Sequence, residues 1–215
     1  MKFRLTYEGQ LLTSSSNTSG RVEAKWAIRK QIYPQLVDLW QTHPVLKGIG
    51  LSAESTVTIA KGVTSLSTPV SIKISSPSQV TLIRLREPMA VGGRDFIPLV
   101  RKSLELTCGL DILFLRRDQP GSLFLQGGDI DNRLKTLFDA LKVPSEADLK
   151  VEQPDPAHDP FFCLLEDDSL ITTFSVETDR LLARPKATPN EVYLVIDVTV
   201  AVTTITETNV GFLGN

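Results

Sequence analysis

Apolar and polar side chains alternate, or apolar side chains run almost without interruption, in four stretches of the chain. Successive side chains of a strand point to opposite faces, so alternation predicts strands that are buried on one face. The predicted strands are residues 2–12, 104–117, 170–176 and 192–202, the second of them largely buried on both faces. The segment 181–190 contains two prolines and predicts a loop that joins the last two strands as a hairpin.

Apolar residues three and four positions apart predict two helices. The first covers residues 21–40 and buries a stripe that includes both tryptophans of the chain. We expect Pro34 to kink or divide this helix, because proline lacks the N–H that the helix needs. The second helix is expected to begin at Asp131 or Asn132, either of which suits an N-cap. Its apolar stripe consists of Leu134, Leu137, Phe138 and Leu141.

Together these elements predict a single α/β domain, of the α+β kind with a mixed sheet. Its 215 residues suffice for one sizeable core. Two insertions interrupt this series of predicted strands and helices: a β-rich segment at about 43–98, and an acidic, proline-containing segment at about 143–165. Two interpretations of the acidic insertion stay open. It is either a solvated loop without influence on its surroundings, or a gate whose negative charge repels phosphates or covers a basic surface.

Composition narrows the class of protein. Hydrophobic residues make up 41% and charged residues 22% of the chain, as in ordinary globular proteins. No apolar run approaches the roughly 18 residues that a membrane span needs, and the N-terminus lacks the apolar stretch of a signal peptide. We therefore expect a cytoplasmic protein without a membrane partner. Two cysteines and two histidines at wide spacing do not complete a zinc site.

The charge is distributed unevenly. A formal net charge of −2 is unusual for a protein that binds nucleic acid, because lysine and arginine normally neutralise the phosphates. Residues 143–168, however, carry eight acidic residues against one lysine, and the rest of the chain holds 22 basic and 17 acidic residues. The sequence outside this segment is therefore basic enough to form a face that attracts phosphate.

Carboxylates gather in two places, around the start of the second helix and at residues 167–168. Asp131, Lys135 and Asp139 follow one another at intervals of four along one edge of the helix, with Asp129 just ahead. Crowded carboxylates repel one another unless a cation lies among them, and oxygen ligands suit Mg²⁺ or Mn²⁺. The pattern indicates metal-assisted phosphodiester hydrolysis, with the lysine stabilising negative charge in the transition state. The alternative is a solvated helix start with an ordinary Asp–Lys pair.

The motif also resembles the signature of one family, the RusA-type Holliday junction resolvases. That resemblance implies a homodimeric, Mg²⁺-dependent endonuclease that cuts branched DNA in recombination and repair. It implies that Asp129, Asp131 and Asp168 bind the metal, and that these three and Lys135 are catalytic. Supporting roles fall to Asn132, Asp139 and Asp167. The motif reads Asp129-x-Asp131-Asn132-x-x-Lys135-x-x-x-Asp139-Ala140-Leu141 and later Asp167-Asp168-Ser169, ahead of a strand.

The resemblance covers residues of about 104 to 205, with a looser likeness at the N-terminus. The chain is longer than typical members, and the acidic insertion separates the two halves of the motif. Because function depends on sites carried by a fold, a second class of function stays open. In that class the chain is a module that keeps the RusA-like fold and binds nucleic acid or protein without cleavage.

Basic residues in three places are candidates for contacts with phosphate. One group lies on the first helix, another follows the strand at 104–117, and one residue lies on the second helix. Charge runs of this kind are also common on plain solvated faces. The candidates are Arg21, Lys25, Arg29, Lys30, Arg116, Arg117 and Arg133.

Overall fold

The computed structural model describes residues 1–11, 18–47, 85–116, 129–182, 191–206 and 208–213, without the side chains of residues 18, 19 and 129. All structural statements concern these residues. Most of the predicted β-rich insertion, residues 48–84, therefore lies outside the described part. Across the described ranges, no helix combines the length and apolar character that crossing a membrane requires.

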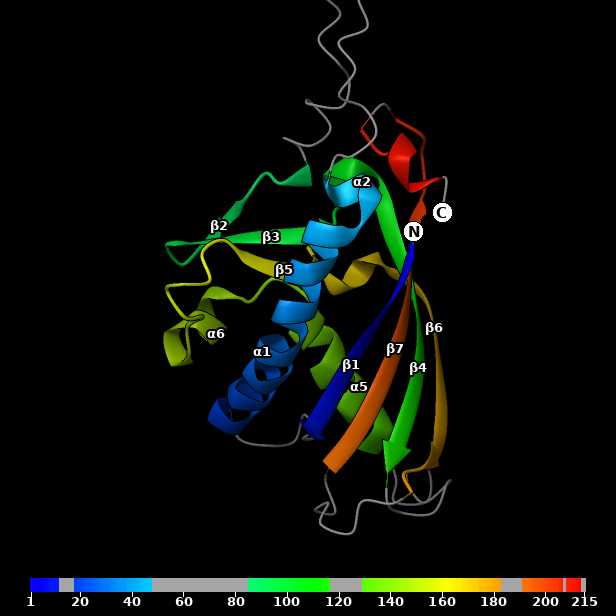
Figure 1. Ribbon diagram of the computed structural model, residues 1–215. Coiled ribbons are helices and arrows are strands. Elements are labelled where there is room, and N and C mark those ends of the chain that lie inside the picture. Colours follow the sequence, from blue (N-terminus) through cyan, green and yellow to red (C-terminus); the bar gives the residue numbers. More distant parts are fainter. Residues whose placement is uncertain (12–17, 48–84, 117–128, 183–190, 207, 214–215) are drawn as a thin grey trace, which may run out of the picture.

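The larger sheet has four strands in the order β1 (Lys2–Gln10), β7 (Glu191–Val202), β4 (Leu106–Arg116) and β6 (Ile171–Arg180), as Figure 1 shows. Strand β7 is antiparallel to both of its neighbours, whereas β4 and β6 are parallel. All four strands were predicted, and their bounds differ from the prediction by a few residues. The largest difference is β6, which continues four residues beyond the predicted end at Val176.

A smaller sheet contains β2 (Met89–Val91), β3 (Arg94–Val100) and β5 (Phe161–Leu165). Strands β2 and β3 are antiparallel, and β3 is parallel to β5. The protein is thus of mixed α/β class with two mixed sheets, which confirms the predicted class at this level.

Two long helices, α1 (Thr18–Thr42) and α5 (Asp129–Leu141), lie on the same side of the larger sheet (Figure 1). Helix α5 begins at Asp129, so the predicted N-cap residues lie in its first turn. Helix α1 is one continuous element with Pro34 inside it, so of the two predicted outcomes, a kink or a division, the division is wrong. The shorter helices are α2 (Pro44–Lys47), α6 (Glu146–Val151) and the 3₁₀ turns η1 (Lys102–Leu104), η2 (Asp168–Leu170) and η3 (Val210–Phe212).

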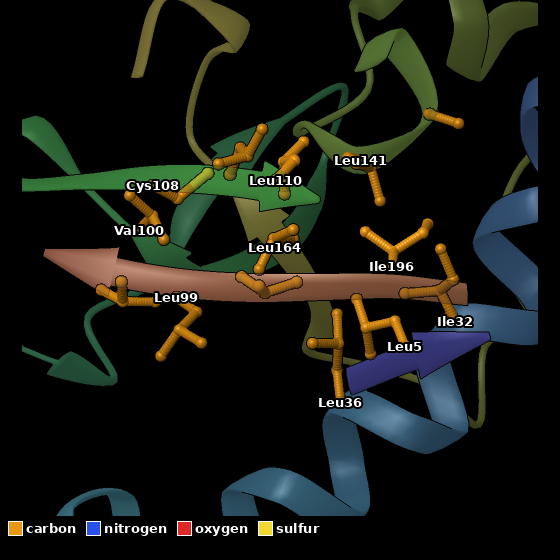
Figure 2. Packing of buried hydrophobic residues seen from close by; sticks show 14 of the residues in the cluster. Leu5, Ile32, Leu36, Leu99, Val100, Cys108, Leu110, Leu141, Leu164 and Ile196 are labelled. Atoms are coloured by element: carbon orange, nitrogen blue, oxygen red, sulfur yellow. The ribbon is translucent and has the colours of Figure 1, made fainter. Parts of the chain in front are cut away.

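Helix α1 stays continuous because it packs on two sides. Ile32 and Leu36 face the larger sheet, next to Leu5 of β1 (Figure 2). On another side, Val22 and Trp26 belong to a second apolar cluster with residues of β3, α6 and β5. Both tryptophans of the helix are buried, as predicted, and this two-sided burial offsets the hydrogen bond that proline removes.

Strand β4 separates β6 from β7, so the predicted hairpin between these two strands is wrong. A hairpin usually has a loop of two to five residues, whereas residues 181–190 are enough chain to pass the end of β4. Strand β4 is fully buried on one face from Leu106 to Arg116, is mostly half-buried on the other, and forms ladders on both sides. The predicted burial of both faces is therefore correct in full for one face only. Strand β6 has mostly exposed side chains and takes the edge position.

The free edge of β1 is covered by two glutamine side chains of α1. Gln35 accepts a hydrogen bond from the backbone N–H of Thr6 at 2.9 Å and donates to its carbonyl at 2.8 Å. Gln31 makes the same pair of bonds with Glu8, at 3.1 and 2.7 Å. The two amides thus replace a neighbouring strand, which protects part of the edge from pairing with other chains.

The acidic insertion contains regular structure. It includes helix α6, whose first turn is capped by Ser145, and strand β5, which extends the smaller sheet. Leu149 of α6 and Phe161 of β5 are buried in the second cluster with Trp26. The interpretation of this segment as a solvated loop is therefore wrong. The apolar residues of α6 are too few to predict a helix from periodicity, whereas the continuous apolar run Phe161–Leu165 is typical of a buried strand and could have predicted β5.

Candidate functional site

The acidic motif lies on α5, which is part of the connection between β4 and β6. A parallel strand pair needs such a crossover, and its helix returns antiparallel to the strands. The first turn of α5, with Asp131, therefore follows the carboxyl end of β4. The last turn lies beside the start of β6, where η2 carries Asp168 (Figure 1).

The structure brings together Asp139, Lys142 and Asp168. The Lys142 ammonium is 3.2 Å from Oδ1 of Asp139 and 3.1 Å from Oδ2 of Asp168. The lysine and Asp139 side chains are each about one quarter exposed (26% and 25%) and that of Asp168 is 41% exposed, so the group lies at the surface rather than in the core. Burial alone would lower the pKa of Lys142, but its hydrogen bonds with Asp168 and Asp139 outweigh burial and raise that pKa.

Asp167 has a structural role next to this group. Its side chain accepts a hydrogen bond from the backbone N–H of Ser169 at 3.0 Å and caps the turn η2. Hydrogen bonds from Ser169 lower the pKa of Asp167, so the carboxylate stays ionised at neutral pH. A capped turn fixes the backbone from which Asp168 extends.

The other motif residues lie nearer the start of α5. Asp131 and Lys135 are exposed and Asn132 is partly buried. Asp131 precedes Asp139 by two turns, which is about 12 Å along the helix axis. Asp129 is the first residue of the helix, and its side chain lies outside the described part of the structure.

Among the described side chains, no three of His, Cys, Asp or Glu come close enough to hold a metal ion together. The pair formed by Asp139 and Asp168 is the place where two acidic segments of the sequence already share one cation, the lysine ammonium. Carboxylate oxygens fit Mg²⁺, which commonly takes one or two carboxylates and completes its shell with water and substrate phosphate. Two carboxylates are chemically compatible with Mg²⁺, but the described side chains assemble no complete ligand set, and Asp131 lies two turns of α5 away from this pair. The assignment of Asp129, Asp131 and Asp168 as ligands therefore stays a prediction.

Three of the predicted phosphate contacts on α1 are paired with the acidic insertion. Asp148 of α6 lies 2.5 Å from the ammonium of Lys25 and 3.3 Å from the guanidinium of Arg29. Lys30 pairs with Glu152 at the end of the same helix. In this structure the basic side of α1 therefore faces acidic side chains of its own chain.

The pair of cations around Asp148 is buried. The side chains of Lys25, Asp148 and Arg29 are 12%, 8% and 2% exposed. Burial alone would raise the pKa of Asp148, but hydrogen bonds and charges from Lys25 and Arg29 outweigh it and hold the pKa below its ordinary value. Arg29 also donates to the backbone carbonyl of Asp139 at 2.8 Å, so one network joins α1, α6 and the last turn of α5.

The remaining candidates for phosphate contact are mostly buried as well. Arg133 is 5% exposed and donates to the carbonyl of Leu11, which attaches the start of α5 to the end of β1. Arg116 is 7% exposed and Arg21 is partly buried. Arg117 lies outside the described residues. The structure thus gathers no exposed basic track from the described candidates, and their role in binding stays a prediction.

The two cysteines are unsuited to nucleophilic chemistry. Both are buried, and burial raises the pKa of each thiol to about 12. The reactive form of cysteine is the thiolate, which is scarce at neutral pH in such an environment.

Two residues that the sequence did not single out take central positions, Lys142 and Asp148. Lys142 follows Lys135 by seven residues and Asp139 by three, so helical spacing along the acidic edge pointed to it. Nothing in the sequence distinguishes Asp148 from the other acidic residues of its segment, because its burial depends on how α6 packs on α1.

Scans against protein-family models, curated proteins and solved structures found no match for this chain.

Proposed function

We propose that the chain is a Mg²⁺- or Mn²⁺-dependent endonuclease of RusA-like fold that hydrolyses phosphodiester bonds in branched DNA. One observation supports this function above all others. Asp139 and Asp168 come from segments far apart in the sequence, yet they approach a single ammonium at 3.2 and 3.1 Å. An acidic edge built from two segments beside one helix suits a cation and, through the cation, a phosphate.

In this proposal, carboxylates along α5 and in η2 hold the metal. The resemblance assigns Asp129, Asp131 and Asp168 to this task, and the shared contact of Asp139 and Asp168 with the Lys142 ammonium supports including Asp139. A bound Mg²⁺ would supply a water of lowered pKa and neutralise charge on the phosphate. Lys135 is exposed on the same edge of the helix, where its ammonium can stabilise negative charge that develops on the substrate.

The proposal includes a homodimer. A four-way junction is close to two-fold symmetric, and a C₂ dimer would present one acidic edge to each of two equivalent strands. A single protomer would match such a substrate poorly.

Cleavage assays on labelled four-way, flap, duplex and single-stranded substrates test the proposal. We expect cleavage of branched DNA with Mg²⁺ or Mn²⁺ and none with a chelator. Asp131→Asn and Asp168→Asn should each lower the rate by about 100-fold or more, because each removes a charge that binds the metal. Asp38→Asn, which neutralises an exposed aspartate of α1, is the matched control and should cleave like the wild type.

Metal linkage provides a readout without substrate. The ions should stabilise the folded protein by about 1.4 kcal/mol for each tenfold excess over the dissociation constant, and Asp131→Asn should abolish this gain. Absence of cleavage on every substrate, together with a melting temperature indifferent to both ions, would refute the proposal.

A second candidate is a module that binds nucleic acid or protein without cleavage. The pairing of Lys25, Arg29 and Lys30 with acidic side chains of the insertion favours the protein-binding form of this candidate, because that arrangement withdraws basic groups from a DNA substrate. Binding of branched DNA that is unaffected by chelator, with intact substrate after long incubation, would support this candidate instead.

A further inference from the structure

We propose that Lys142 is the residue that positions Asp168 against the last turn of α5. The role of that positioning in catalysis rests on the proposed nuclease function, whereas the positioning itself does not. Lys142 belongs neither to the motif nor to the predicted site, and it is the residue through which the two acidic segments meet.

The backbone around Lys142 already holds the segment that carries Asp168. Lys142 pairs with Leu165, the last residue of β5, in an isolated parallel bridge. The N–H of Val143 donates to the carbonyl of Leu165 at 3.0 Å. Asp168 follows Leu165 by only three residues, so the Lys142 side chain has a short distance to span. Its ammonium lies 3.1 Å from Oδ2 of Asp168.

Charge explains why a lysine is needed at this place. Asp139 and Asp168 both approach one ammonium at the end of α5, and two carboxylates held near the same point repel one another. The carbonyl end of a helix adds partial negative charge. An ammonium between Asp139 and Asp168 offsets both effects and favours the conformation in which Asp168 faces the helix.

A simpler account is a pair between Lys142 and Asp139 alone, at the common helical spacing of three residues. The two accounts differ in which aspartate transmits the effect of removing the lysine charge. Substitutions in the background of Asp168→Asn or Asp139→Asn therefore distinguish them.

The test measures hydrogen exchange of the Ser169 and Leu170 amides, which the turn η2 protects through bonds to Asp167. Lys142→Gln should accelerate their exchange by about two- to fivefold, the range expected for a partly exposed ion pair. Lys142→Arg should restore protection, because it keeps the charge. In the Asp168→Asn background, Lys142→Gln should have no further effect. Lys47→Gln, an exposed lysine of α2, is the matched control.

The same variants are then compared in the cleavage assay. Lys142→Gln should lower kcat by about tenfold or more with little change in KM, since small displacements of a reacting group are costly. Lys142→Arg should recover most of the loss.

Unchanged exchange in Lys142→Gln would overturn the proposal, and so would an effect that persists with Asp168→Asn but disappears with Asp139→Asn. If exchange responds as expected while kcat does not, the lysine positions Asp168 without serving the reaction, which overturns the catalytic part. If the wild type cleaves nothing, the nuclease function fails, and the exchange data still decide whether Lys142 positions Asp168.

Discussion

The buried pairing of Asp148 with Lys25 and Arg29 predicts that Asp148→Asn strongly destabilises the fold. Asparagine has nearly the same size and keeps one acceptor, but it removes the only carboxylate among the described residues that lies within 4.0 Å of both cations. Two positive charges would then stay in a site where their side chains are only 12% and 2% exposed. A buried charge that loses its partner is costly, because neither water nor protein solvates it.

The expected loss is about 3 kcal/mol, the lower end of the range for removing one partner of a buried ion pair, since asparagine still accepts hydrogen bonds. For a chain of this size, this loss lowers the melting temperature by about 6–12 °C. It is also a large fraction of the roughly 5–15 kcal/mol that stabilises a typical domain.

Urea unfolding monitored by tryptophan fluorescence measures the change, because Trp26 is buried against the cluster that α6 covers. Glu152→Gln is the matched control. It makes the same chemical change near the same helix but affects the pair with Lys30, whose side chain is 61% exposed. An exposed pair contributes at most about 1 kcal/mol, so the control should unfold close to the wild type.

The pH dependence provides a further check. Asp148 has a pKa below its ordinary value of 3.8 in the folded protein. A carboxyl with a depressed folded pKa stabilises the fold above its unfolded pKa, and this contribution is lost as pH falls through the folded pKa. The difference between wild type and Asp148→Asn should therefore be constant near neutral pH and shrink below about pH 3.8. Equal unfolding of Asp148→Asn and Glu152→Gln, or a difference independent of pH in acid, would refute the reasoning.

Three further predictions concern other parts of the molecule. Gly92 and Gly93 both have positive φ (57° and 78°), but an added Cβ at Gly92 would lie 2.9 Å from the Leu149 side chain, whereas one at Gly93 would have no neighbour within 4 Å. Gly92→Ala should therefore lower the free energy of unfolding in urea by about 1–3 kcal/mol more than Gly93→Ala. Equal losses for the two variants would contradict the contact with Leu149. Gln35→Ala leaves the backbone N–H and carbonyl of Thr6 without their Gln35 partners, so we expect the free energy of unfolding to fall by about 1–3 kcal/mol and self-association through the β1 edge to increase. The control Gln153→Ala, at an exposed residue, should change neither property. Light scattering should show a dimer at micromolar concentration; monomers with and without branched DNA would count against a junction resolvase.

Much of the fold was predictable from periodicity. Alternation located β1, β4, β6 and β7 to within a few residues, and the stripe from Leu134 to Leu141 located α5. These elements bury one face against a single core, so their apolar residues recur at a regular interval. Helix α1 was also predicted, but its pattern left open whether Pro34 kinks or divides it, because its packing on two sides does not show in a local pattern.

Strand order required the tertiary structure. Short sequence separation favoured a hairpin between β6 and β7, but β4 lies between them. Strand β4 has enough apolar side chains to be buried between two neighbouring strands. Strand β6 has mostly exposed side chains, so it gives up little apolar burial by lying at the edge of the sheet. Which strands pair depends on the burial of whole faces, and a local pattern does not contain that information.

The candidate site divides in the same way. The sequence by itself predicted which residues carry the proposed chemistry, since the carboxylates and Lys135 stand at helical spacing on α5 and Asp168 stands just before a strand. Only the tertiary structure decided what each of them meets. The crossover puts Asp168 at the end of α5, where Lys142 lies, because the helix of a parallel crossover runs antiparallel to its strands. Likewise Asp148 and Arg29 are ordinary charged residues in the sequence, and they form a buried pair because α6 folds over α1 and excludes water from both.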